Sequence, residues 1–124
     1  MKTVTLKTAT EKEFFARGRR VAKLADAGKP LPSESVVSFE DPLDLLKVLS
    51  AGRIDLFRAV KEQADSISGI AARLQRDRSA VKRDVDQLAR VGLIHIDDEV
   101  LPGHGRMKKV RAAASSFRLE AQLA

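Results

Sequence analysis

The chain has 124 residues and a net charge of +6; 44% of its residues are apolar, 4% are aromatic and none is cysteine. This length gives room for one domain with a small appended unit, the missing cysteines exclude disulfides and thiolate metal sites, and the scarce aromatics argue against a broad stacking surface for single-stranded nucleic acid. No apolar run is long enough to span a bilayer and the start lacks the hydrophobic core of a signal peptide, so we expect a cytoplasmic protein.

A strand, a helix and a second strand are predicted in the first 40 residues. Residues 3–8 alternate apolar and polar side chains, as a half-buried strand does. Thr10, with Glu13 three residues later, forms a capping box that begins the helix, and Gly28 ends it. Residues 35–40 are the second strand. A unit this small is not stable alone, so we expect it to pack on the rest of the chain, on a second copy or on a partner protein.

The apolar stripe of this first helix supplies candidate contacts for a dimer or for a partner protein. Its largest members are Phe14, Phe15 and Val21, with lysines and arginines on the opposite side. The same side chains could equally pack within the chain, and both interpretations stay open. We therefore treat residues 1–40 as a dimerisation or partner-binding extension and residues 41–124 as a second domain.

Two short amphipathic helices come next. Asp41 can cap the first helix, Pro42 suits its first position because no amide donor is needed there, and Gly52 is expected to end it. The second helix is predicted over residues 53–64. Its inward side chains are Ile54, Phe57 and Val60.

The stretch ISGIAARLQRDRSAVKRDVDQLARVGLIHI, from Ile67 to Ile96, predicts two further helices joined by a tight polar turn. Apolar residues at three- and four-residue spacing give each helix an inner face. These residues are Ile67, Ile70, Ala71 and Leu74 in the first helix, and Val81, Val85 and Leu88 in the second. Asp77 in the turn can accept the free amide protons of Ser79 and Ala80, and Gly92 stops the second helix.

A β-hairpin and a last strand are predicted after these helices. Residues 93–96 form the first strand, 97–105 the connection and 106–110 the returning strand. Residues 116–123 alternate as a strand does, although their composition also favours a helix. Two helices, a helix-turn-helix and a hairpin follow the order of a winged helix. The predicted fold is therefore α+β, a winged helix-turn-helix with an N-terminal strand-helix-strand extension.

The segment IAARLQRDRSAVKRDVDQLARVGLIHI resembles the core of winged-helix regulators of the MarR and ArsR type. In those proteins a small residue, a capped polar turn, a valine-centred recognition helix and a strand that begins at GLI recur. The resemblance covers Pro42 to Arg111, and Gln75 departs from it, because many such turns carry glycine for a left-handed backbone. More narrowly, RDRSAVKRDVDQLARVGLI and the strand-helix-strand opening resemble small prokaryotic DNA-binding regulators, several of which look like antitoxins of toxin-antitoxin pairs. This resemblance implies a toxin protein as a partner.

The candidate DNA contacts are polar side chains on the second helix of the helix-turn-helix and on the hairpin. The first two turns of a recognition helix can reach base edges. Arg or Lys there can bond guanine, and cations in the turn and wing can contact phosphates, which give affinity without reading sequence. Arg106 could alternatively enter the minor groove. The helix candidates are Arg78, Ser79, Lys82 and Arg83, and the phosphate candidates are Arg76, Arg106, Lys108 and Lys109.

Catalytic and metal sites find little support in the sequence. The only histidines, His95 and His104, have no metal-ligand spacing, and no lysine and serine pair follows the Pro102–Gly105 turn as a phosphate loop requires. Residues 97–99 are acidic and are expected to form a solvated loop, with metal capture a minor alternative. We expect no enzyme, no cofactor and no metal.

The sequence therefore predicts a sequence-specific regulator that binds double-stranded DNA. Its sharper version is an antitoxin that represses its own operon as a homodimer on a palindromic operator. The net charge is +5 over residues 1–30, −3 over residues 31–66 and +4 over residues 106–124. Basic ends around an acidic middle suit a protein that binds a polyanion. They are also compatible with a basic surface that only keeps the protein soluble. The main alternative is a winged-helix module that docks protein. RNA binding is a third, disfavoured by the lack of stacking aromatics.

Overall fold

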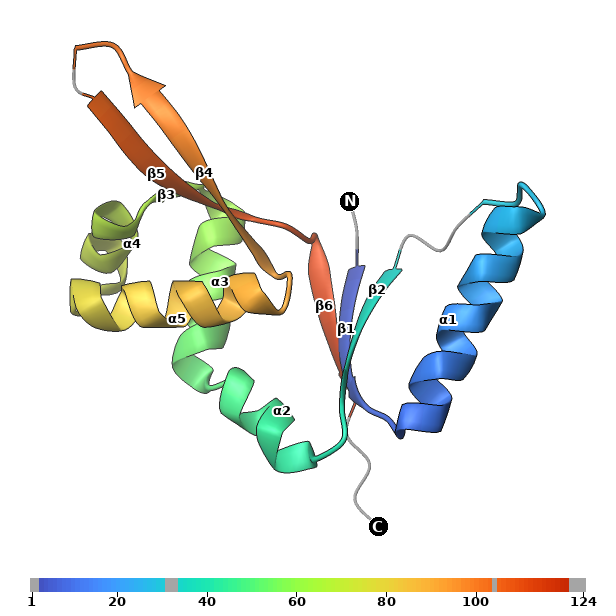
Figure 1. Cartoon of the computed structure of the whole chain (residues 1–124). Coiled ribbons are helices and arrows are strands. Elements are labelled where there is room, and N and C mark those ends of the chain that lie inside the picture. The colour runs from blue at the N-terminus through green and yellow to red at the C-terminus, as the bar shows by residue number, and fades with distance from the viewer. Residues whose placement is uncertain (1–2, 31–33, 104, 121–124) are drawn as a thin grey trace. The chain divides into compact units, whose positions relative to one another are not determined.

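The computed structural model describes residues 3–30, 34–103 and 105–120 (Figure 1). The chain forms two compact units, one of Met1–Lys47 with Ser116–Ala124 and one of Val48–Ser115. We expected a single division between residues 40 and 41. The chain instead returns to the first unit after Ser115, because its last strand pairs there.

The first unit is a three-stranded parallel sheet with one crossover helix. Its strands β1 (Thr3–Thr8), β2 (Glu34–Phe39) and β6 (Ser116–Glu120) lie in the order β2-β1-β6. On β1, Leu6 lies opposite Val37 of β2 and Leu119 of β6. Both Leu6 and its neighbour Thr5 are buried, so both faces of the central strand are covered. The described part of the tail is therefore a strand and not a helix, while residues 121–123 of that prediction lie outside the described residues.

Two helices belong to this unit, and local side chains begin both. In α1 (Glu11–Asp26) the Thr10 hydroxyl accepts a hydrogen bond from the Glu13 amide at 3.2 Å, which confirms the predicted cap. In α2 (Pro42–Val48) the Asp41 carboxylate accepts the Leu43 amide at 2.9 Å.

The prediction that Gly52 ends a helix is wrong. The helix α2 ends at Val48, and Gly52 lies in the first turn of α3 (Ala51–Glu62). Ser50 begins α3 because its backbone is extended and its hydroxyl accepts the Arg53 amide at 3.2 Å. Gly52 does not adopt the positive φ of a helix-ending glycine, as Gly92 does at 80°.

The second unit is a winged helix. After α3 come β3 (Asp65–Ser66), α4 (Ile67–Leu74), α5 (Arg78–Arg90), β4 (Ile94–Leu101) and β5 (Gly105–Ala112). The strands form an antiparallel sheet in the order β3-β5-β4, and the short β3 was not predicted. The buried residues confirm the predicted inner faces of α4 and α5, except that Leu74 is only partly buried. In α3, Leu56 is buried, whereas Ile54, predicted to face inward, is partly exposed. Its buried side chains include Leu56, Phe57, Val60, Ile67, Ile70, Val81, Val85, Leu88 and Val110.

The β4–β5 hairpin is longer than predicted. Residues 97–101, expected to form part of the connection, lie in β4, where Asp98 is opposite Lys108 and Leu101 is opposite Gly105. Opposite charges directly across an antiparallel pair stabilise the strands, and positive φ values at Gly103 and Gly105 close the tip. The acidic run is therefore part of a strand and not a loop. His104 lies outside the described residues.

Candidate nucleic-acid interface

The turn between α4 and α5 is built from a left-handed residue and a capping carboxylate. Gln75 adopts φ 53° and ψ 46°, and the amides of Gln75 and Arg76 donate to the carbonyls of Ala72 and Ala71 at 3.3 and 3.0 Å. This pair of bonds is the usual ending of a helix at a left-handed residue. The backbone thus follows the glycine-type geometry although Gln75 carries a side chain, at a cost of about 1 kcal/mol.

Asp77 then begins α5 as predicted. Its Oδ2 accepts the amides of Ser79 and Ala80 at 3.1 and 3.3 Å. The carboxylate satisfies two of the free donors at the helix start and complements the positive end of the helix dipole. The start of α5 is therefore held in a defined direction.

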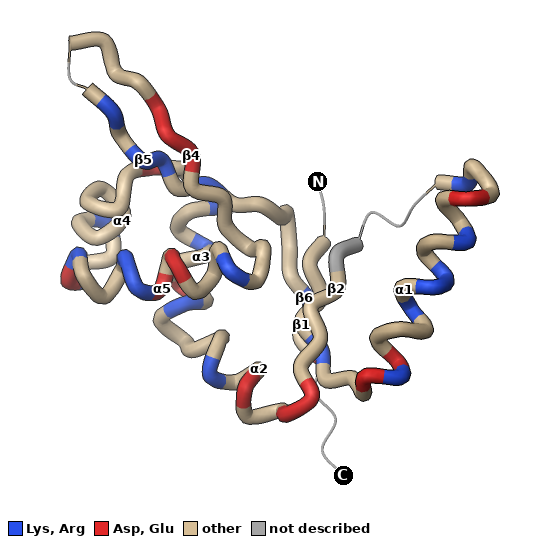
Figure 2. The backbone as a smooth tube through the Cα atoms, viewed as in Figure 1, with Lys and Arg blue, Asp and Glu red and all other residues tan. Residues whose placement is uncertain are grey.

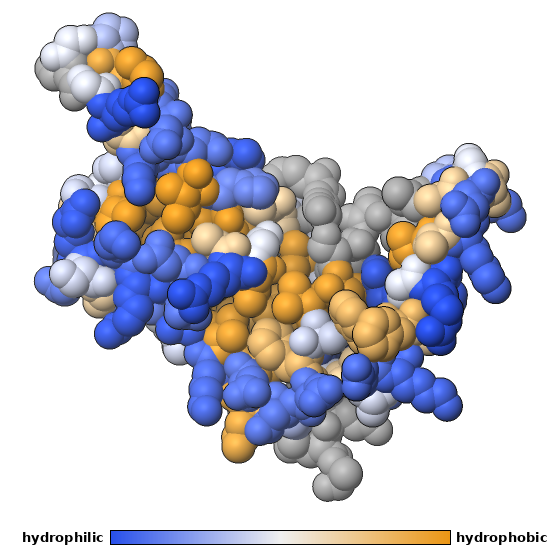
Figure 3. All heavy atoms as spheres, in the orientation of Figure 1, coloured by the Kyte–Doolittle hydropathy of each residue, from blue (hydrophilic) through white to orange (hydrophobic). Residues whose placement is uncertain are grey.

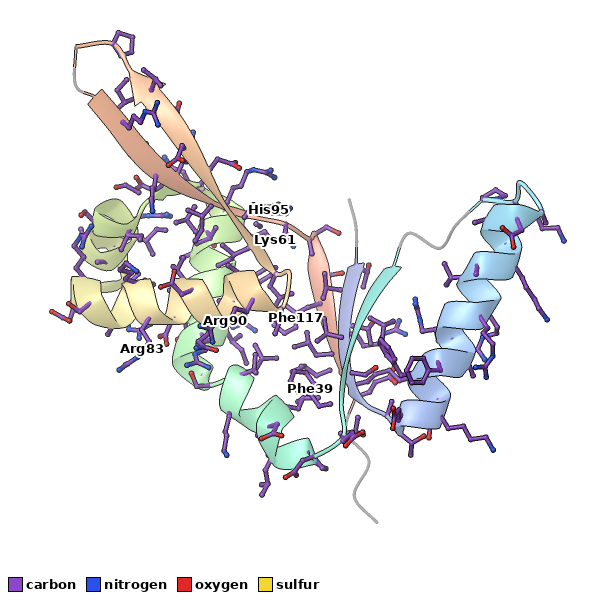
Figure 4. The ribbon with its side chains drawn as sticks, in the orientation of Figure 1. Phe39, Lys61, Arg83, Arg90, His95 and Phe117 are labelled. Carbon is purple, nitrogen blue, oxygen red and sulfur yellow. The ribbon has the colours of Figure 1, made fainter. Side chains whose placement is uncertain are left out.

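The buried stripe of α5 determines which side chains face outward. Val81, Val85 and Leu88 are fully buried, which fixes the rotation of the helix about its axis. The exposed side chains at its N-terminal half include all four predicted helix contacts, Arg78, Ser79, Lys82 and Arg83. Figure 2 shows the positive charges on this half of α5, and in Figure 4 Arg83 projects from the helix.

The cations on this face are only weakly engaged. Arg78 Nε donates to the Ser68 hydroxyl of α4 at 3.0 Å, and Lys82 Nζ donates to Asp86 at 3.0 Å. Within the described part of the chain Arg83 makes no hydrogen bond or ion pair. Exposed pairs of this kind contribute a few tenths of a kcal/mol, so a phosphate or a base can replace Ser68 or Asp86.

The structure places Arg76, predicted as a phosphate contact, in an ion-pair cluster instead. Its Nη2 lies 2.6 Å from Oδ2 of Asp84, and its Nη1 donates to the Gly52 carbonyl at 3.4 Å. Asp84 lies on the inner side of α5 and is 6% exposed. On its other oxygen it accepts a hydrogen bond from Arg53 Nε at 3.0 Å, and Arg53 also donates to the Val48 carbonyl. One carboxylate thus connects α5, the turn and α3.

The electrostatics of this cluster keep Asp84 charged. Burial raises the pKa of the Asp84 carboxyl, but hydrogen bonds from Arg76 and Arg53, together with their positive charges, lower it by more. Its pKa therefore lies below the ordinary value of 3.8. Asp84 is not among the predicted site residues, although an aspartate between the inner residues Val81 and Val85 indicates a buried acid that needs a cationic partner.

The wing carries paired charges. Lys109 Nζ lies 3.8 Å from Glu99, Asp97 accepts a hydrogen bond from Arg111 Nε, and Asp98 is opposite Lys108. The acidic strand β4 therefore neutralises most of the positive charge of β5. Arg106, opposite the 70% exposed Val100 near the tip, forms no ion pair with the residues that the structure describes.

No group of three histidine or acidic side chains that could hold a metal ion occurs among the residues described. In the same ranges no helix combines the length and the apolar character needed to cross a membrane. His95 is exposed on β4, opposite Arg111.

Comparisons with known proteins concern mainly the second unit. The family model HVO_A0114 matches residues 48–119, which is more than half of the chain. No curated protein matches the sequence.

Several solved structures show a limited similarity. A protein from Methanosarcina mazei Go1, described as a possible transcriptional regulator, has 17% identity and a TM-score of 0.47 over 56% of this chain. Reduced HlyU from Vibrio cholerae N16961 has 19% identity and a TM-score of 0.48 over 59% of this chain and 73% of its own. The transcriptional regulator HlyU from Vibrio vulnificus CMCP6 has 17% identity and a TM-score of 0.47, over 82% and 83%. The chain spans 62% of the length of the Methanosarcina protein.

Proposed function

The chain belongs to the HVO_A0114 family, and we propose that it is a transcriptional regulator that binds double-stranded DNA through α5. One observation carries this proposal: the N-terminal half of α5 exposes four polar side chains, three of them cationic, on a helix whose opposite face is buried. A helix anchored in this way can enter the major groove as a rigid element.

Each candidate contact has a distinct role in this proposal. Arg78, Lys82 and Arg83 bond guanine edges or phosphates, and Ser79 bonds a base or a phosphate. The wing lies along the DNA backbone, with Arg106 as its main contact because Lys109 is already paired with Glu99. Arg76 supports the turn through its ion pair with Asp84.

The protein acts by binding in this proposal, and it carries out no reaction and needs no cofactor or metal. Its expected cytoplasmic location agrees with access to DNA. A single winged helix reads few base pairs, so two copies bind a palindromic operator with their recognition helices about 34 Å apart.

The antitoxin function is the most specific part of the proposal. Its support is the resemblance of the stretch from Arg76 to Ile94, with the strand-helix-strand opening, to small antitoxin-type regulators. In that case the protein represses its own operon and binds a toxin encoded beside it. Co-expression with the neighbouring gene product, followed by purification of a stable complex and rescue of growth, tests this part separately.

Binding to the DNA upstream of the protein's own gene tests the main proposal. Fluorescence anisotropy compares this fragment with a scrambled fragment at two salt concentrations. We expect preference for the native fragment and a steep loss of affinity with salt, because cations displace counterions from phosphates. Equal weak binding to both fragments would contradict a sequence-specific regulator and favour the protein-docking alternative.

Two double variants that each remove two positive charges test whether α5 is the surface that binds DNA. Lys82→Ala with Arg83→Ala should weaken binding at least tenfold. Arg58→Ala with Lys61→Ala removes the same charge from exposed positions on α3 and should change affinity little. Equal losses in both double variants would show that net charge alone, and not α5, causes binding.

A further inference from the structure

A cavity lies between α1 and the carboxyl ends of β1 and β2, within the first unit. Its volume is about 180 Å³. Lys7 and Ser38 are opposite each other in the parallel register and both line this cavity, so it lies on one face of the sheet at the ends of the strands. Ligands of open parallel sheets bind outside the carboxyl ends of the strands. We infer that this α1–β2 cavity, whose lining includes Lys7, Glu13, Phe14, Arg17, Arg20 and Ser38, binds a small phosphate monoester.

The lining of the α1–β2 cavity is positively charged. Lys7, Arg17 and Arg20 contribute three positive charges and Glu13 one negative charge, which leaves +2. The carboxylate of Glu13 belongs to the start of α1, where it accepts a hydrogen bond from the Thr10 hydroxyl at 3.2 Å. A phosphate monoester carries a charge of about −1.5 to −2 near neutral pH, so it balances this lining more closely than a carboxylate does.

Two of these cations have no anionic partner of their own. The ammonium group of the partly buried Lys7 and the guanidinium group of the exposed Arg20 form no hydrogen bond or ion pair with the residues that the structure describes. Glu120 is opposite Lys7 on β6, but its Oε1 lies 3.8 Å from Nη1 of Arg118. An ammonium group binds phosphate as a compact charge, and a guanidinium group can bind two of its oxygens at once. Both groups are therefore available to a phosphate.

A second cavity adjoins the first and is mainly apolar. It has a volume of about 210 Å³ and shares Phe14, Arg17 and Val36 with the α1–β2 cavity, while Gly18 and Val21 complete its lining. A Cβ atom added at Gly18 would meet no atom within 4 Å, so no side chain fills this space. Together the two cavities reach the size of small-ligand sites, which begins at about 300 Å³. The phosphate monoester therefore carries a short apolar body, such as a single ring.

A third cavity beside α1 has the opposite charge. Its volume is about 200 Å³, Glu11 and Glu40 line it, and its described lining residues include no lysine or arginine. It shares Phe14 and Ser38 with the α1–β2 cavity. These carboxylates repel a phosphate. The phosphate group is therefore expected beside the arginines and not beside the first turn of α1.

The apolar side chains predicted as dimer or partner contacts have different surroundings. Phe14 and Val21 line the second cavity, whereas Phe15 lines none of the three cavities and is 52% exposed. The rings of Phe14 and Phe15 contact each other edge to face, with centroids 5.7 Å apart. Figure 3 shows strongly hydrophilic side chains beside apolar ones along α1. A ligand ring can stack on Phe14, which is 50% exposed, and leave Phe15 to a partner.

This inference goes beyond the proposed function and does not depend on it, because the cavities lie in the first unit and exclude α5. Isothermal titration calorimetry of the full chain, in a buffer without phosphate, compares phenyl phosphate, inorganic phosphate and benzoate. Phenyl phosphate should bind about tenfold more tightly than benzoate and several-fold more tightly than inorganic phosphate. Equal binding of benzoate, or no saturable binding of phenyl phosphate at millimolar concentration, would overturn the inference.

Two double variants of equal charge locate the phosphate. Lys7→Gln with Arg20→Gln should weaken the binding of phenyl phosphate about tenfold. Arg19→Gln with Lys23→Gln removes the same charge from exposed positions of α1 that line none of the three cavities, and it should change the affinity less than twofold. Circular dichroism checks that both variants keep their helices. Equal losses in the two variants would show that net charge, and not the α1–β2 cavity, holds the anion.

Filling the second cavity tests the position of the apolar body. Gly18→Leu should abolish the preference for phenyl phosphate over inorganic phosphate and leave the binding of inorganic phosphate unchanged. Leucine favours a helix more than glycine does, so the helix content should not fall. A preference that survives in Gly18→Leu would overturn this placement.

Competition separates a small ligand from nucleic acid as the source of the phosphate. A DNA duplex of scrambled sequence should not displace phenyl phosphate from the wild-type chain. Displacement by the duplex would assign Lys7 and Arg20 to the DNA backbone and overturn the small-ligand site.

Discussion

Arg76 Nη2 lies 2.6 Å from Oδ2 of Asp84, so a carboxylate on the inner side of α5 holds an arginine from the turn that precedes this helix. Arg53 of α3 occupies the other oxygen at 3.0 Å. The direction of α5 therefore depends on a charge cluster behind it as well as on apolar packing. Arg76, predicted as a phosphate contact, is thus also held by this cluster and supports the start of α5.

Replacing Asp84 should destabilise the fold. Asp84→Asn leaves Arg53 and Arg76 without their anion, and removal of one partner of a buried ion pair costs about 3 kcal/mol in the free energy of unfolding. Urea unfolding monitored by circular dichroism measures this loss. Asp86→Asn on the same helix, whose carboxylate pairs with Lys82 on the surface, should cost less than about 0.5 kcal/mol. Equal effects of the two substitutions would contradict a structural role for the cluster.

The same carboxylate should make stability depend on pH in the acidic range. The pKa of Asp84 is lower in the folded chain than its ordinary value of 3.8. The unfolded chain therefore binds the proton first, and the stabilisation is complete above about pH 4 and is lost as pH falls through the folded pKa. The difference in unfolding free energy between wild type and Asp84→Asn should be constant near neutral pH and should shrink below pH 4. A difference that stays constant down to pH 2 would contradict the lowered pKa.

The turn before α5 should tolerate glycine better than its native residue. Gln75 has φ 53°, a region that glycine adopts without steric cost. Gln75→Gly should therefore raise the free energy of unfolding by up to about 1 kcal/mol. Gln87→Gly, inside α5, should lower it by about 1 kcal/mol, since glycine is a poor helix former. Destabilisation by both would show that the Gln75 side chain makes a contact worth more than the strain.

The wing cations should contribute unequally to DNA binding. Arg106 has no acidic partner among the described residues, whereas Lys109 lies 3.8 Å from Glu99. Arg106→Ala should therefore weaken binding to the upstream fragment several-fold and reduce the salt dependence by about one phosphate contact, while Lys109→Ala should have a smaller effect. Anisotropy titrations at several salt concentrations compare the two. A larger loss for Lys109→Ala would reverse the assigned roles.

Local features could be predicted from the sequence because their partners lie within a few residues. The caps at Thr10 and Asp77 each involve an amide at most three positions away, and both are present. The inner face of α5 follows from helical spacing, which also places Arg83 on the outside. The order of helices and hairpin in the winged helix was predictable for the same reason.

Contacts between distant residues were decided by the tertiary structure. Strand β6 pairs with β1, with Ser116 opposite Thr3, although these residues lie near opposite ends of the chain. No sequence pattern near Ser116 indicates which strand it pairs with. Asp84 accepts a hydrogen bond from Arg53, which lies 31 residues away in the sequence. This contact exists only when α3 and α5 pack against each other. Helical periodicity and capping depend only on residues within one helix and its ends. The sequence by itself therefore determined the helix-turn-helix and its outward face. Strand partners, wing length and the position of Arg76 depend on which elements meet, and only the packed fold determines that.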